Sequence, residues 1–91
     1  MEKIMFKQIL DSLELGREIE FSYNNRQYSI TNSEGYWNFC CDTDPVTTEK
    51  ICPFEDRASL ISRISAYSIE NTPLSLIFDE EKYDKNSLCI F

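Results

Sequence analysis

The sequence of 91 residues contains no histidine and only two glycines. Without histidine, the chain lacks the side chain that most often acts as a general base near neutral pH, so its serines and cysteines lack their usual activator. The glycines, Gly16 and Gly35, belong to no glycine-rich run, which excludes a recognisable phosphate-binding loop. These absences lead us to expect a protein that is not an enzyme and that carries no cofactor.

The four cysteines lack the spacing of a structural zinc site. Cys40 and Cys41 are adjacent, whereas Cys52 and Cys89 lie far along the chain, and zinc ligands usually come in pairs such as C-x-x-C. Neighbouring residues of a strand point to opposite faces, so the adjacent pair is poorly placed to share one metal. We expect reduced thiols and no bound metal, with Cys41 and Cys89 as candidates for the core. Disulfides stay open as an alternative.

Long apolar runs are also missing. No run approaches the length that crosses a membrane, and the first residues lack the apolar core and cleavage site of a signal peptide. We therefore expect a cytoplasmic protein. The composition, 42% hydrophobic and 13% aromatic, is typical of a folded chain. Without repeats or a linker, we expect one small domain over residues 1–91, with residues 42–50 as a mobile loop.

Alternating apolar and polar residues over 18–31 predict an antiparallel hairpin. Asn24 and Asn25 tolerate positive φ and therefore suit a two-residue loop. That loop sets Phe21 opposite Tyr28, which places the apolar side chains together on one face and the acidic and hydroxyl side chains on the other. A loop of three residues would mix the two faces, so this register is favoured.

A second turn at residues 32–35 predicts a third strand. We expect it to bring Trp37 opposite Ile30, with Gly35 in the left-handed conformation and Cys41 on the apolar face. The result is a three-stranded meander with one aromatic face and one acidic, hydroxyl-rich face.

Apolar residues at helical spacing predict a helix before the meander and a second one after it. Gly16 follows the first stripe as a C-terminal cap. The second helix is expected to start within residues 52–56, with Pro53 near its first turn, and to end near Ser68. The two stripes are Phe6, Ile9, Leu10 and Leu13, and then Leu60, Ile61, Ile64 and Tyr67.

The last twenty residues are more ambiguous. Thr72 resembles an N-cap of a third, short helix with Leu74, Ile77 and Phe78 on one face, although the same run could form a strand. Residues 88–91 offer a short terminal strand that would extend the meander. The predicted fold is α+β, with an N-terminal helix packed on a three-stranded antiparallel meander, followed by one or two helices and this candidate strand.

Charge suggests the kind of partner. Sixteen acidic against nine basic residues give a net charge of −7, so we expect no direct contact with nucleic acid or anionic membranes. Acidity instead suits a basic protein partner, although simple solubility explains it as well. Glu18 and Glu20 share one face of a strand and could form a catalytic pair of carboxylates. We do not expect this role, because two such carboxylates normally belong to a solvated face of a sheet. The candidate partner-binding residues are Glu18, Glu20, Asp42, Asp44, Asp79, Glu80 and Glu81.

A resemblance rests on the first half of the chain. An amphipathic helix, then Gly16-Arg-Glu-Ile-Glu-Phe-Ser-Tyr-Asn-Asn-Arg-Gln-Tyr-Ser-Ile-Thr31 and Gly35-Tyr-Trp37, resembles small uncharacterised acidic proteins of bacteriophages and other mobile elements. The resemblance carries no functional motif. It implies an inhibitor of a basic, nucleic-acid-handling protein, such as an anti-CRISPR-like inhibitor or a nucleic-acid mimic. The alternatives are an immunity protein or antitoxin, a structural module that self-associates and, last, a small-ligand domain.

Overall fold

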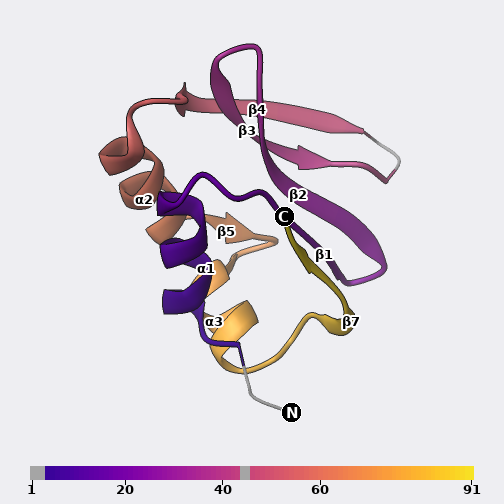
Figure 1. Ribbon diagram of the computed structural model, residues 1–91. Coiled ribbons are helices and arrows are strands. Elements are labelled where there is room, and N and C mark those ends of the chain that lie inside the picture. Colours follow the sequence, from indigo (N-terminus) through magenta and orange to yellow (C-terminus); the bar gives the residue numbers. More distant parts are fainter. Residues whose placement is uncertain (1–3, 44–45) are drawn as a thin grey trace.

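The computed structural model describes residues 4–43 and 46–91. In chain order the elements are α1 (Phe6–Glu14), β1 (Ile19–Tyr23), β2 (Arg26–Ser33), β3 (Tyr36–Cys41), β4 (Thr47–Pro53), α2 (Arg57–Ser65), β5 (Ser68–Ile69), β6 (Thr72–Pro73), α3 (Leu74–Asp79) and β7 (Asp84–Ile90). Five strands form one antiparallel sheet in the order β4-β3-β2-β1-β7, and β5 pairs with β6. Figure 1 shows the three helices on one side of the large sheet. The class is α+β, as predicted, but the sheet has five strands rather than three.

The first hairpin has the predicted register. Phe21 pairs with Tyr28 across β1 and β2, and the loop residues Asn24 and Asn25 have φ angles of 53° and 63°. Such a loop matches the twist of the strands that it joins. The apolar face of the hairpin is buried, with Phe21 fully inaccessible.

The second hairpin differs from the prediction by two residues. Ile30 pairs with Phe39 and not with Trp37. The reason is a turn of only two residues, Glu34 and Gly35, whose φ angles of 53° and 84° are both positive. Because side chains alternate with a period of two, this shift leaves every side chain on its predicted face. Trp37 is therefore still buried.

The segment predicted as a loop at 42–50 forms the start of β4 from Thr47 onward. It pairs with β3 as an edge strand, and its first four side chains are exposed, which explains their polar character. Pro53 ends this strand and does not open a helix. α2 begins only at Arg57, where Asp56 is the N-cap and its Oδ1 accepts a hydrogen bond of 3.1 Å from the Ser59 N–H. The helix ends at Ser65, short of the predicted Ser68.

The first and third helices are present as predicted. α1 ends at Glu14, and Gly16 follows it with a φ of 87°. The Arg17 N–H donates to the Ser12 carbonyl at 3.0 Å, a hydrogen-bond pattern that closes many helices. For α3 the N-cap is Pro73, while the predicted cap Thr72 belongs to β6. No helix in the described ranges, 4–43 and 46–91, is long and apolar enough to cross a membrane.

The C-terminal strand is longer than predicted and pairs with β1, so it does extend the sheet. Leu88 and Ile90 pack against the core, while Cys89, predicted as a core candidate, is exposed because it faces the opposite side. The core lies between the sheet and the helices. Its largest fully buried side chains are Trp37, Phe21, Phe78, Ile9, Leu13, Ile19, Ile30, Leu60, Ile64, Leu74 and Ile77.

Candidate functional site

The face of the large sheet that points away from the helices carries small polar side chains. Pairing across the strands aligns Glu20 with Ser29, Ser29 with Cys40, and Cys40 with Thr48. No element of the described ranges covers this face in Figure 1. We call it the open sheet face. Its side chains are Glu20, Ser22, Gln27, Ser29, Thr31, Asn38, Cys40, Thr48, Lys50 and Cys89, together with Asp42, which continues the row of Asn38 and Cys40 just after β3.

Two predicted site residues lie together at this face. Glu20 is opposite Ser29, and the Ser29 hydroxyl donates to the Asp42 Oδ2 at 3.4 Å. The Ser29 side chain therefore lies beside that of Glu20 on β1 and is bonded to that of Asp42, which follows β3. Within the part of the chain that the structure describes, neither carboxylate has a lysine or arginine as an ion-pair partner. This arrangement leaves two negative charges available to a cationic surface.

Glu18 has a different role. Its Oε2 accepts a hydrogen bond of 2.9 Å from the backbone N–H of Asn32, and its side chain is half-buried. This bond ties the residue before β1 to the far end of β2. The carboxylate that the sequence assigned to partner contact thus stabilises the sheet.

Three more predicted acidic residues lie apart from the open sheet face, in the last position of α3 and in the two residues after it. Asp79 Oδ1 accepts a hydrogen bond of 2.7 Å from the Phe6 N–H at the start of α1. Glu80 and Glu81 form ion pairs with lysines of the same segment, at 3.6 Å and 3.2 Å. This group is therefore partly neutralised within the chain. The last candidate, Asp44, lies outside the described residues.

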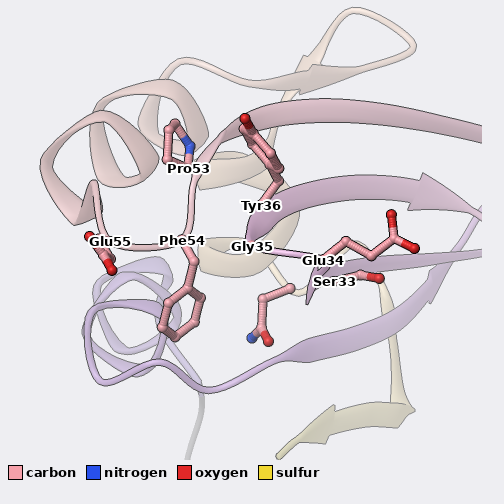
Figure 2. A pocket seen from close by; sticks show the side chains of 8 residues that line it. Ser33, Glu34, Gly35, Tyr36, Pro53, Phe54 and Glu55 are labelled. Atoms are coloured by element: carbon pink, nitrogen blue, oxygen red, sulfur yellow. The ribbon is translucent and has the colours of Figure 1, made fainter.

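A hollow of about 540 Å³ lies between the β2–β3 turn and the segment after β4. Figure 2 shows its walls, with the side chains of Phe54 and Tyr36 between those of Glu34 and Glu55 in this view. We call it the tip hollow. Its lining residues are Asn32, Ser33, Glu34, Gly35, Tyr36, Pro53, Phe54 and Glu55.

Hydrogen bonds fix the tip hollow. The Phe54 N–H donates to the Gly35 carbonyl at 2.8 Å, and the indole N–H of Trp37 donates to the Phe54 carbonyl at 3.1 Å. The Phe54 ring also stacks on Trp37, with 5.5 Å between ring centroids. This site was not predicted from the sequence, because its two halves are far apart in the chain. Aromatic residues beside a Glu-Gly turn and beside Pro53 were the available signal.

The two rings of the tip hollow, exposed Tyr36 and half-buried Phe54, already contact cations of the chain. Lys50 Nζ lies 4.1 Å from the centroid of the Tyr36 ring, and Arg57 Cζ lies 4.4 Å from that of Phe54. The carboxylates of Glu34 and Glu55 are exposed, and no described side chain or backbone group is bonded to either.

Groups with shifted pKa values lie on the helix side of the sheet. Burial, together with the neighbouring Glu49 carboxylate, raises the pKa of Tyr67 to about 12. Burial also raises the pKa of the Cys52 thiol. All four cysteines are free, with Cys40 half-buried on the open sheet face and Cys41 buried in the core. The described ranges contain no group of three metal-ligating side chains.

The open sheet face and the tip hollow both offer carboxylates, hydrogen-bonding side chains and, at the tip, aromatic rings to another molecule. Such groups suit recognition of a cationic protein surface. Comparisons with protein-family models, with curated proteins and with solved structures found no match. Function is therefore inferred from the geometry and charge of these two surfaces.

Proposed function

We propose that this chain is a cytoplasmic, non-enzymatic binding protein of phage or mobile-element type that inhibits a basic, nucleic-acid-handling protein. It would act as an anti-CRISPR-like inhibitor or as a nucleic-acid mimic. The observation that carries the proposal is the open sheet face, on which Glu20 and Asp42 flank Ser29 without an ion-pair partner in the described ranges.

The shape of this face supports a macromolecular partner. Its residues come from several adjacent strands and are mostly small, so they present a broad polar surface. Two carboxylates held on a rigid sheet, in a chain of net charge −7, complement a groove that is lined with lysine and arginine. Complementary charge of this kind accelerates encounter and selects partners.

Three of the acidic residues predicted from sequence contribute less to this surface. Glu18 is bonded to the backbone of Asn32, and Glu80 and Glu81 are paired with lysines. We therefore assign the contact to Glu20 and Asp42 first. Reversal of Glu18 is a poor test because it would disturb the sheet as well as the charge.

The test begins with capture of the partner by the tagged protein from its native host. The double variant Glu20→Lys and Asp42→Lys should then slow association with the captured protein by about tenfold or more at low salt. The matched control is Asp11→Lys with Glu14→Lys, which changes the net charge equally on the exposed side of α1. Its association rate should stay within about twofold of the parent rate.

Unchanged association of the Glu20 and Asp42 variant would refute this assignment. An equal loss in both variants would show that net charge alone acts. The identity of the captured protein separates the alternatives, because a toxin encoded beside this chain indicates an immunity protein or antitoxin. Recovery of the chain itself, with a mass in light scattering that rises with concentration, indicates a self-associating module.

A further inference from the structure

We infer that the tip hollow binds an arginine side chain presented by a protein partner. The hollow lies beyond the open sheet face, and its volume of about 540 Å³ is ample for one long side chain. The inference rests on the proposed function in one respect: the arginine is assigned to a basic partner protein. Binding of the guanidinium itself follows from the residues that line the hollow.

The walls of the tip hollow include two aromatic rings that can attract a cation. Tyr36 is 38% exposed and Phe54 is half-buried, so both rings keep accessible area. Each ring already holds a cation of the chain, from Lys50 and Arg57, within 4.4 Å of its centroid. Attraction of cations by aromatic rings is strongest where water is partly excluded, as in a hollow. An incoming guanidinium would therefore have to stack on the ring area that Lys50, Arg57 and Trp37 leave accessible, and its attraction to the two carboxylates must outweigh repulsion by these two cations.

The carboxylates provide the second step. Glu34 and Glu55 are the only charged residues of the lining, and they lie on opposite sides of the Phe54 ring in Figure 2. A guanidinium can stack on a ring while its N–H groups, which project in the plane, reach carboxylates at the rim. The compact, strongly hydrated ammonium of lysine satisfies both needs less well.

The backbone at Glu34 provides the third step. Its φ of 53° is a conformation that favours asparagine or glycine, and the first hairpin has Asn24 and Asn25 at its two turn positions. Two other glutamates share this conformation, but Glu70 accepts a hydrogen bond of 2.7 Å and Glu81 forms an ion pair. Glu34 alone of the three has no such contact within the described ranges. A strained residue without an internal partner points to an external one.

The position of the hollow adds support. A second hollow of about 430 Å³ shares Ser33, Glu34 and Tyr36 with the tip hollow and reaches Asn38 and Cys40 of the open sheet face. A partner that binds to the open sheet face would therefore also have side chains close to the tip hollow. One continuous interface can thus include both surfaces.

The experiment uses the isolated protein and three peptides, acetyl-Gly-Xaa-Gly-amide, in which Xaa is arginine, lysine or citrulline. Citrulline matches the shape of arginine but lacks its charge. Backbone amide signals of the ¹⁵N-labelled protein are followed as each peptide is added. We expect the arginine peptide to shift the signals of residues 34–36 and 54–55 with a dissociation constant in about the millimolar range, and the other two peptides to bind more weakly.

Variants complete the test. Glu34→Asn removes the charge but suits the turn. The variant should bind the arginine peptide about threefold more weakly than the parent protein, and it should have a higher Tm. The matched control Glu70→Asn makes the same change in the β5–β6 turn and should leave peptide binding unchanged. A loss of binding in Glu34→Asn cannot then be attributed to unfolding.

Three results would overturn the inference: no shift at the tip, binding of citrulline or lysine as tight as that of arginine, or full binding by Glu34→Asn. The outcome is separate from that of the proposed function. If the peptide binds at the tip but no basic partner is captured, the arginine site stands and the proposed function fails. The reverse result removes only the arginine site.

Discussion

Arg57 joins three segments of the chain, and its replacement should destabilise the fold strongly. Its Nε donates to the Phe54 carbonyl at 3.0 Å, and its Nη1 donates to the Glu14 carbonyl at 2.8 Å. The second acceptor lies in the last turn of α1, where carbonyls have no partner within the helix. The guanidinium also lies over the Phe54 ring, at 4.4 Å. One side chain therefore fastens the end of α1 to the start of α2.

The expected loss can be worked out from these contacts. A hydrogen bond from a charged donor contributes about 1.5–3 kcal/mol, and we take the low end because one of the two bonds is exposed. Contact of the guanidinium with the ring adds about 0.5 kcal/mol at an exposed site. Arg57→Ala should thus lower the free energy of unfolding by about 3.5 kcal/mol, which corresponds to a drop in Tm of about 14–28 °C for a domain of this size.

Urea unfolding and thermal melts of three variants test this estimate. Arg63 is the matched control, because it is exposed on the same helix and its side chain has no hydrogen bond, ion pair or ring contact in the described ranges. Arg63→Ala should cost less than about 0.5 kcal/mol. Arg57→Lys should recover less than half of the loss, since lysine keeps the charge but not the two fixed donors. Equal effects of Arg57→Ala and Arg63→Ala would refute the reasoning.

Two further outcomes follow from single contacts. Asp79→Ala should cost about 1 kcal/mol, because the Phe6 N–H loses its acceptor at 2.7 Å, and hydrogen exchange should then accelerate in the first turn of α1. The control Glu80→Ala should leave that turn unchanged, and equal rates in both variants would contradict this role. The pKa of Tyr67 is raised from 10.0 to about 12, so the unfolded chain loses its proton first and stability should fall between these pH values. In Tyr67→Phe the denaturant midpoint should fall less over this pH range than it does in the parent protein. An equal fall in both proteins would contradict this role of Tyr67.

Turn chemistry explains why one hairpin was predicted correctly and the next was not. Asn24 and Asn25 indicate a two-residue loop because asparagine adopts positive φ readily. Glu34 gives no such signal, so the sequence suggested a turn at 32–35 in place of the observed Glu34 and Gly35. The error of two residues kept the faces correct, since the period of a strand is two. The burial of the meander could therefore be predicted although its second register could not.

Long-range pairing accounts for the segment that was misassigned. The residues from Thr47 to Lys50 are polar and exposed, and on local grounds they resemble a loop. They form a strand because β3 offers an unpaired edge, as in the pairing of Cys40 with Thr48. An edge strand needs few apolar side chains, so its sequence carries little signal. The terminal strand β7 was easier to predict because Leu88 and Ile90 alternate toward the core.

Contacts between distant segments also decide which acidic residues of the candidate site are engaged within the chain. The sequence shows which side chains are acidic but not which of them are already engaged. Folding brings the Asn32 N–H to Glu18 and the Phe6 N–H to Asp79, so both carboxylates stabilise the fold. Glu34, which was not among the predicted site residues, has no such partner in the described ranges and lines a hollow with aromatic walls. Positive φ alone does not identify such a residue, because Glu70 and Glu81 share it and are engaged within the chain. Glu34 combines the local cost of this conformation with an unused charge, so it is the turn position at which partner contact is best tested.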